Sequence, residues 1–295
     1  MSAVLTLIAN PAAPLTPGDL DRAAAALGAP AGAPDWLAPG IAVDIPTTAP
    51  AGPVMEEVVR TALMGRPVDV ALLPLEGRRK RLLIADMDST MIGQECIDEL
   101  ADLVGKRTIV SAITERAMRG ELDFPAALRE RAAMLRGPPL ARLRETYEQR
   151  ITLNPGARSL VMTMRKHGAF TALVSGGFTY FTGRVREAAG FDHDQANILE
   201  SEHDALTGIV REPILGQDAK REALERLARD RGLVLADTLA VGDGANDLAM
   251  IGVAGLGVAF HAKPRVATAA RVRIDHGDLT ALLYLQGYRR AEFLA

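Results

Sequence analysis

Four acidic side chains stand in two short segments that could share one chemical site. Asp86 and Asp88 are two residues apart in DMDST, and Asp243 and Asp247 are four apart in GDGAND. A single pair of this kind is also typical of a turn or a helix cap, where Asp is favoured. Two pairs that meet would repel one another unless a cation lay among them, and hard oxygen ligands completed by water suit Mg²⁺. The four acids together therefore predict a magnesium site.

A small polar segment and one lysine could complete an anion site. Ser175 is followed by Gly176 and Gly177, where glycine backbone can approach a ligand and expose N–H groups while the serine adds a hydroxyl donor. On its own, a Gly-Gly pair usually marks a simple turn. Lys220 is by itself typical of a surface lysine, and it becomes a candidate phosphate ligand only beside the other groups.

The elements that must position these residues are short apolar runs that alternate with helical patterns. Three runs end directly before the polar segments and predict strands buried on both faces: Leu82–Ala85, Phe170–Val174 and Thr238–Val241. Parallel strands in an open sheet bind ligands beyond their carboxyl ends. The fold class that follows is α/β, with a parallel sheet covered by helices on both faces, and we expect the three segments to meet at one edge of that sheet.

Further elements are expected around this sheet. The helices are Ala157–Lys166, Ala219–Arg229 and one that begins at Asn246–Ile251, while Leu256–Phe260 predicts a strand and Asn197–Glu202 with Ala205–Val210 predict a hairpin. The stretch from Gln94 to Arg150 has helical spacing and many charges. Its expected helices are Ile97–Leu103, Ile109–Met118, Phe124–Leu135 and Pro139–Arg150. This stretch is therefore predicted to be a helical insertion.

Residues 1–78 predict a small α/β unit. Its expected strands are Ala3–Ala9, Ile41–Ile45 and Val68–Leu73, and its expected helices are Thr16–Leu27 and Met55–Leu63. The Pro- and Gly-rich stretch Ala29–Gly40 is expected to be a loop. The charged run at 78–81 is expected to be a solvated turn before the next strand.

Composition limits the classes of partner. Hydrophobic residues make up 48% of the 295 residues and charged residues 24%, with a formal net charge of -3. These values permit a sizeable core and give no sign of nucleic-acid binding. The N-terminus lacks the features of a signal peptide, and no apolar run is long enough to cross a bilayer. With Cys96 as its one cysteine, the chain is expected to be cytoplasmic, without a membrane partner.

The ordered set DMDST, Ser-Gly-Gly, Lys220 and GDGAND resembles the haloacid dehalogenase superfamily of phosphohydrolases, and the helical insertion resembles its first-type cap. Within that superfamily the chain is most similar to the phosphoserine phosphatase family, through MIGQECID, FPAALRERAAML and GVAFHAKP at 257–264. The resemblance covers residues 80–290. It implies a catalytic core at 79–94 and 153–295 and a cap at 95–152, while residues 1–78 are similar to the ferredoxin-like or amino-acid-binding (ACT-like) halves that precede some family members.

The resemblance also implies roles for the residues at the strand ends. Asp86 would be the nucleophile, and Asp88 would protonate the leaving oxygen and then activate water. Mg²⁺ would be held by Asp86, the backbone carbonyl of Asp88, and Asp243, while Asp247 would bind metal-bound waters or orient Lys220. The phosphoryl oxygens would contact Ser175, Gly176 and Lys220, with Asn246 as a further phosphate or substrate contact.

Substrate choice is expected from the cap. Arg131 would take a carboxylate and Glu95 an ammonium group, which together suit a zwitterionic amino acid. Met118 and Phe124 would shield the site, although ordinary helix packing explains them equally well.

The implied activity is hydrolysis of O-phospho-L-serine, the last step of serine biosynthesis, by an enzyme that could form a homodimer. Two alternatives stay open: a phosphatase or phosphotransferase for another small ester, and a regulatory amino-acid-binding protein with a vestigial site.

Overall fold

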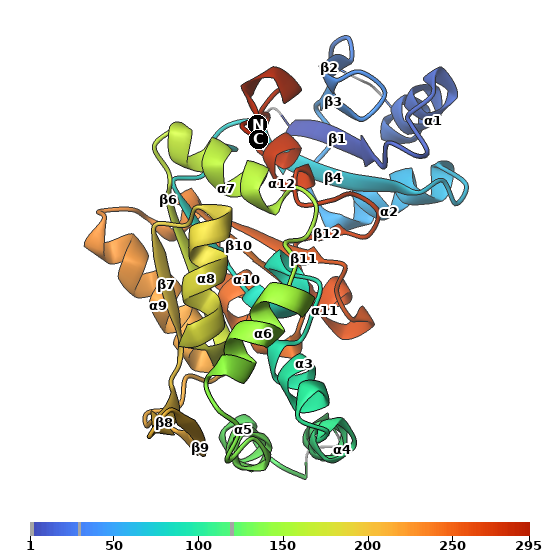
Figure 1. Ribbon diagram of the computed structural model, residues 1–295. Coiled ribbons are helices and arrows are strands. Elements are labelled where there is room, and N and C mark those ends of the chain that lie inside the picture. Colours follow the sequence, from blue (N-terminus) through green and yellow to red (C-terminus); the bar gives the residue numbers. More distant parts are fainter. Residues whose placement is uncertain (1–2, 29–30, 119–120) are drawn as a thin grey trace.

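The computed structural model describes residues 3–28, 31–118 and 121–295 and contains two large sheets (Figure 1). The larger sheet has six parallel strands in the order β12-β11-β10-β5-β6-β7. Its strands are β5 (Leu82–Ala85), β6 (Phe170–Phe178), β7 (His193–Asn197), β10 (Thr238–Gly242), β11 (Leu256–Phe260) and β12 (Val272–Ile274). The expected α/β fold with a parallel sheet is confirmed.

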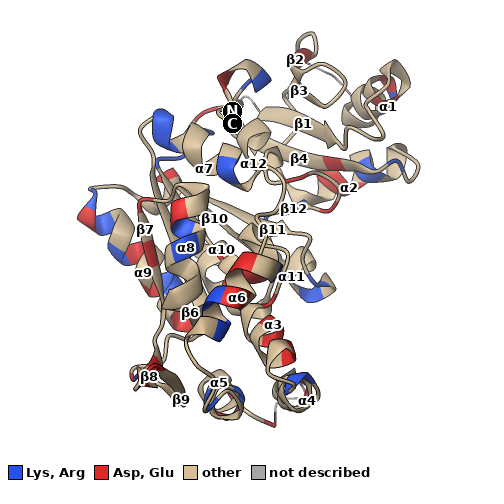
Figure 2. Ribbon diagram, in the orientation of Figure 1, with Lys and Arg blue, Asp and Glu red and all other residues tan. Residues whose placement is uncertain are grey.

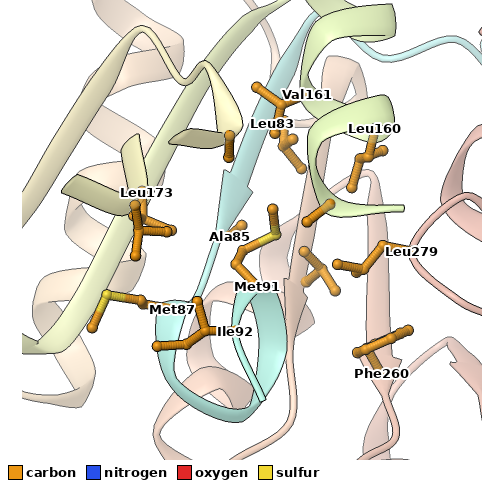
Figure 3. Close-up of a cluster of buried hydrophobic side chains, with 14 of the residues drawn as sticks. Leu83, Ala85, Met87, Met91, Ile92, Leu160, Val161, Leu173, Phe260 and Leu279 are labelled. Atoms are coloured by element: carbon orange, nitrogen blue, oxygen red, sulfur yellow. The ribbon is translucent and has the colours of Figure 1, made fainter. Parts of the chain in front are cut away.

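Alternate side chains of β5 pack into different cores because a strand is pleated. Leu83 and Ala85 join the cluster beneath α7 and α8, where Figure 3 shows them beside Leu160 and Val161. Leu82 and Ile84 join the cluster beneath α9 and α10 on the other face. The covering helices are α7 (Ala157–Lys166), α8 (Thr179–Ala189), α9 (Gln217–Asp230), α10 (Leu248–Val253), α11 (Pro264–Ala269) and α12 (Ala281–Leu285). Burial on both faces explains why β5 is a continuous apolar run.

The N-terminal residues form an antiparallel sheet of their own, in the order β2-β3-β1-β4. Its elements are β1 (Ala3–Ala9), α1 (Pro17–Leu27), β2 (Asp35–Ala38), β3 (Ala42–Thr47), α2 (Pro53–Ala62) and β4 (Val68–Pro74). This βαββαβ order with β1 and β3 in the centre is ferredoxin-like, as expected. One prediction is wrong: the stretch Ala29–Gly40 contains strand β2, which pairs with β3 through backbone bonds that its Pro- and Gly-rich sequence does not reveal.

The second face of the N-terminal sheet packs on the core. Ile8 and Ala71 belong to the same apolar cluster as Leu283 of α12, and β4 lies next to β12 in Figure 1. The expectation of a solvated turn at 78–81 is wrong for Arg78. Its guanidinium is nearly buried, pairs with Asp44 at 2.5 Å and donates to the carbonyl oxygens of two residues of the core. A partner distant in sequence thus buries a charge that a local pattern would place in water.

The helical insertion contains the four expected helices, α3 (Cys96–Leu103), α4 (Arg107–Met118), α5 (Phe124–Met134) and α6 (Ala141–Arg150). The two segments that join it to the core pair with each other: Ile92 forms an antiparallel bridge with Leu153, and Gln94 Nε2 donates to Thr152 Oγ1 at 3.0 Å. The predicted hairpin is also present, as β8 (Leu199–Glu202) and β9 (Ala205–Val210). It lies against α5, so the core contacts the insertion at a second place.

Acidic and basic residues are interspersed over the outer helices (Figure 2). Within the described ranges, no helix has the length and apolar character required to cross a membrane.

Candidate active site

Three neighbouring parallel strands deliver the polar segments to one edge of the sheet. Asp86 follows β5, Ser175 lies near the end of β6, and Asp243 follows β10. Strand β5 pairs with both β6 and β10, so the three segments are adjacent. The backbone N–H of Asp86 extends this pairing by donating to Val241 O at 3.0 Å. The convergence expected from the sequence is therefore what the sheet order produces.

Lys220 lies between two carboxylates in the interior. Its ammonium contacts Asp86 Oδ1 and Asp247 Oδ1, each at 2.6 Å, and only 2% of the residue is exposed. Burial alone would lower the pKa of Lys220, but the charges of Asp247 and Asp86 outweigh it and the pKa is raised. The lysine is thus a fixed positive charge, since an unpaired ammonium would not be stable at this depth.

One lysine does not balance the acids around it. Carboxylate oxygens of Asp86, Asp243 and Asp247, all buried, lie within 4.8 Å of one another. Burial and the charge of Asp247 raise the pKa of Asp86, and the same two causes raise that of Asp243 to about 6. A further cation would relieve this repulsion, and an all-oxygen donor set suits Mg²⁺. The residues present therefore fit the expected metal.

Asp88 is held in a different environment from Asp86. Its Oδ1 accepts the backbone N–H of Cys96 at 3.0 Å, where the first cap helix begins. Burial, followed by the charge of Glu95, raises the pKa of Asp88 to about 7. Such a carboxyl group can hold a proton and release it near neutral pH. The two aspartates of DMDST thus have environments suited to different tasks.

Ser89 turns the chain between Asp88 and the cap. It has a positive φ of 56°, which is uncommon for a residue with a side chain and often marks a functional segment. Its Oγ donates to Glu95 Oε1 at 2.7 Å. The turn therefore connects the catalytic segment to the residue expected to bind an ammonium group.

The Ser-Gly-Gly segment is fixed by a residue that the sequence analysis missed. Asn197, buried at the end of β7, donates from Nδ2 to Gly176 O at 2.8 Å, while its Oδ1 accepts Leu215 N–H at 2.7 Å. Ser175 Oγ in turn accepts Gly177 N–H at 2.9 Å. A Cβ at Gly177 would approach Asp88 Oδ2 to 2.9 Å, so only glycine lets the two segments lie this close. Asn197 is the last residue of the short polar strand β7, and no local pattern marks it as a site residue.

The polar strand ends and the cap enclose a cavity of about 440 Å³. This volume suits a small metabolite. Apart from buried Lys220 and Asp247 and from Met118, all the expected site residues line it: Asp86, Asp88, Glu95, Phe124, Arg131, Ser175, Gly176, Asp243 and Asn246. The side chain of Met118 lies outside the described part of the structure, so its predicted shielding role stays a prediction.

The cap contributes an apolar wall and one guanidinium. Phe124 lies against Gly176, where an added Cβ would come within 2.9 Å of the ring. Arg131 is half-buried on α5; burial lowers its pKa, and the nearby charges of Asp98 and Glu95 oppose that shift. An arginine remains charged under these conditions. The cavity therefore combines an acidic end at the sheet with a cation at the cap.

Two other residues at the acidic end were not singled out from the sequence. Thr90 of DMDST donates from Oγ1 to Asp243 Oδ1 at 3.2 Å, which joins the two acidic motifs. Lys263 lines the cavity, and its charge acts to lower the pKa of Asp243. Its place in GVAFHAKP, directly after β11, was the available signal, because β11 ends at the same edge of the sheet.

Residues 83–251 match the family model described as haloacid dehalogenase-like hydrolase. The chain is 46% identical over 226 residues to phosphoserine phosphatase of Polaromonas sp., which covers 75% of this chain and 96% of the relative. It is similar to the unliganded structure of a probable phosphoserine phosphatase from Vibrio cholerae, with a TM-score of 0.79, 32% identity and coverage of 99% of this chain and 88% of that one. A structure described as a phospho-aspartyl intermediate analogue of phosphoserine phosphatase matches with a TM-score of 0.65 and 39% identity, over 70% of this chain and 98% of the other.

Proposed function

Since this chain belongs to the haloacid dehalogenase-like hydrolase family, we propose that it hydrolyses O-phospho-L-serine to L-serine and phosphate. The observation that carries the proposal is the cavity, which is lined by Asp86 at the edge of the sheet and by Arg131 on helix α5 of the cap. The side formed by the sheet edge suits a phosphoryl group beside a nucleophile, and the side formed by the cap suits a carboxylate. In this proposal the reaction is the last step of serine biosynthesis.

The first step transfers the phosphoryl group to Asp86. An oxygen of its carboxylate attacks phosphorus, and the bond from phosphorus to the serine oxygen breaks. Asp88 gives its proton to that oxygen as it leaves, which its raised pKa allows. Lys220 contacts Asp86 from the interior, so its charge stabilises the negative charge that accumulates beside it.

The second step releases phosphate. Asp88, now ionised, accepts a proton from water, and the water oxygen attacks phosphorus while the bond to Asp86 Oδ breaks. Both carboxylates return to their initial protonation states, so the cycle is balanced. The Ser-Gly-Gly segment, held by Asn197, supplies hydroxyl and N–H donors to the phosphoryl oxygens in both steps.

Mg²⁺ would be held by Asp86, the backbone carbonyl of Asp88, and Asp243. When bound, it offsets the repulsion between these carboxylates and the phosphate and stabilises charge in the transition state. Asp247 accepts hydrogen bonds from Lys220 and from Gly244 N–H at 3.0 Å, which favours a role in orienting Lys220.

In this proposal two residues of the cap, Arg131 and Glu95, recognise the substrate. The guanidinium of Arg131 would bind the serine carboxylate in bidentate geometry, and Glu95 would accept the ammonium group. Phosphoethanolamine lacks the carboxylate, so this pair disfavours it. Glu95 and Arg131 together therefore favour an amino-acid phosphate over small phosphate esters that lack a carboxylate. The substrate is a small molecule. The enzyme would act in the cytoplasm, because a chain with a single cysteine forms no internal disulfide and suits a reducing compartment.

A substrate panel tests the proposal. Phosphate release should be measured with phosphoserine, phosphohomoserine, phosphoethanolamine and an aryl phosphate, each with Mg²⁺ and after chelation. We expect the highest kcat/KM for phosphoserine with Mg²⁺, loss of activity on chelation, and recovery when Mg²⁺ is added. A preference for phosphoethanolamine would contradict the substrate, and undiminished activity after complete chelation would contradict the metal requirement.

Replacement of Arg131 by alanine should act on substrate choice. Loss of one charge-assisted contact costs about 1.5–3 kcal/mol, which corresponds to roughly a 10- to 150-fold lower kcat/KM for phosphoserine. The aryl phosphate has no carboxylate, so its kcat/KM should change little. Steady-state kinetics with both substrates give the comparison.

Arg129→Ala is the matched control for that experiment, because Arg129 lies on the same helix but pairs with exposed Glu212 at 2.6 Å. It should leave both substrates unaffected. Equal losses on phosphoserine and aryl phosphate in Arg131→Ala would show that Arg131 does not bind the carboxylate.

A further inference from the structure

A buried acid of the N-terminal sheet holds a loop of the catalytic core. Asp69, on β4, is 3% exposed. Its carboxylate accepts backbone N–H groups from Asp275 at 2.7 Å, from His276 at 3.1 Å and from Gly277 at 2.7 Å. Hydrogen bonds to an ionised acceptor are stronger than neutral ones. The loop 275–277 is therefore fastened to the N-terminal sheet by one side chain.

The same loop supports a segment that reaches the catalytic cavity. Gly277 O lies 2.8 Å from His261 Nε2, and the backbone N–H of His261 donates to Ile274 O at 2.8 Å. His261 has a φ of 44°, in the left-handed region, and its ring stacks on Phe260. Contacts on both sides of the residue thus hold a backbone conformation that a residue with a Cβ adopts at a cost.

Two residues beyond His261, the segment meets the acidic end of the cavity. The backbone N–H of Lys263 donates to Asp243 O at 3.3 Å, and the Lys263 side chain lines the cavity. A continuous series of contacts therefore runs from Asp69 through Gly277 and His261 to Asp243. The series consists of the buried carboxylate of Asp69, one part-buried hydrogen bond from the His261 ring, and backbone groups, so a displacement at Asp69 should pass from each contact to the next.

We propose that Asp69 is a positioning residue, which fixes the loop 275–277 and, through His261, sets the places of Lys263 and Asp243 at the catalytic centre. The N-terminal sheet is then a structural component of the active site rather than an independent module. The inference rests on the proposed function only in taking Asp243 as a metal ligand.

Other contacts of the N-terminal sheet provide a control. Asp44 pairs with Arg78 at 2.5 Å and accepts Thr6 Oγ1 at 2.7 Å, and the contacts of Arg78 in the core go to α12, away from the catalytic edge. Asp44→Asn and Asp69→Asn therefore each remove a buried carboxylate from the same interface. They differ in whether the lost contacts lead to Asp243.

The test measures unfolding temperature, the Kd for Mg²⁺ by calorimetry in the absence of substrate, and kcat/KM for phosphoserine in the full-length protein. Asp69→Asn replaces one acceptor oxygen by an NH₂ group that faces N–H donors. Loss of a group that hydrogen-bonds a metal ligand typically weakens metal binding or activity by about 10–100-fold, and Asp69 acts through intervening contacts, so the lower end of this range applies. We expect both the Mg²⁺ affinity and kcat/KM to fall about tenfold in Asp69→Asn.

Asp44→Asn should lower the unfolding temperature but leave Mg²⁺ affinity and kcat/KM within about twofold of wild type. The inference is overturned if Asp69→Asn keeps wild-type Mg²⁺ affinity and kinetics, or if Asp44→Asn loses both to the same extent. Because calorimetry needs no phosphoserine, a wrong substrate assignment would leave this measurement interpretable.

His261→Asn tests the path without touching the N-terminal sheet, which also covers the case of an Asp69 variant that does not fold. Asparagine tolerates a positive φ but is too short to reach Gly277 O. It should reproduce the loss seen in Asp69→Asn, and the double variant should be no worse than the more severe single one. Losses that multiply would mean that Asp69 does not act through His261.

Discussion

Asp86→Asn should abolish turnover while the protein remains folded. The amide is nearly the same shape as the carboxylate but cannot attack phosphorus, and loss of a catalytic nucleophile lowers kcat on the order of 10⁴- to 10⁶-fold. Phosphate release from phosphoserine under saturating Mg²⁺ would measure this loss. The effect should be equally large for an aryl phosphate, because every substrate needs the nucleophile.

The fold gives an independent check on that variant. Burial and the charge of Asp247 raise the pKa of Asp86, which means that the ionised form is disfavoured in the folded, metal-free protein. A neutral amide removes this cost, so the unfolding temperature of metal-free Asp86→Asn should equal or exceed that of wild type. A folded variant that retains substantial activity would rule out Asp86 as the nucleophile.

Asp88→Asn should produce a smaller and more selective loss. General acid–base catalysis contributes about 10²- to 10⁴-fold to the rate. The serine oxygen is a strongly basic leaving group, so its departure depends on a proton from Asp88. An aryl oxide leaves without a proton, so phosphorylation of Asp86 should continue with an aryl phosphate while hydrolysis of the intermediate is slow. Rapid-mixing measurements should therefore show a burst of aryl alcohol, one per active site, followed by slow turnover.

The pH dependence of wild type follows from the same residue. In the proposed mechanism Asp88 carries a proton in the first step. Burial raises its pKa to about 7, so the protonated fraction falls as pH rises through that value. The positive charge of a bound metal favours the ionised carboxylate of Asp88, so the loss of its proton moves to a lower pH. We expect kcat/KM for phosphoserine to fall on the alkaline side, and this limb to be absent in Asp88→Asn. An unchanged limb in the variant would assign it to another group.

Much of the catalytic sheet could be predicted because its signals are local. A run such as Leu82–Ala85 is apolar throughout since both faces of β5 are buried, and the polar residue that follows must lie at the sheet edge. The helices of the cap were equally visible, because each has enough turns to show a 3.6-residue period. The relation between DMDST and GDGAND followed from strand ends alone.

The features that could not be predicted depend on contacts between distant residues. Helix α12 is buried along its whole length, so it shows no amphipathic pattern and was not assigned. Asn197 and Asp69 are single polar residues whose partners are backbone groups 21 and more than 200 positions away, respectively. Arg78 lies in a basic run that predicts solvent exposure. It is nearly buried because it pairs with Asp44, which the local sequence does not reveal. The roles of the N-terminal sheet can therefore be recognised only from the three-dimensional structure.

The covalent intermediate on Asp86 can be tested directly. Enzyme and Mg²⁺ would be mixed with phosphoserine, quenched within one turnover and reduced with borohydride, which converts an aspartyl phosphate to homoserine. Peptide mass spectrometry then locates the change. We expect homoserine at position 86 and nowhere else, and none in Asp86→Asn. Phosphate release without any modified aspartate, or with the change at another position, would contradict the proposed mechanism.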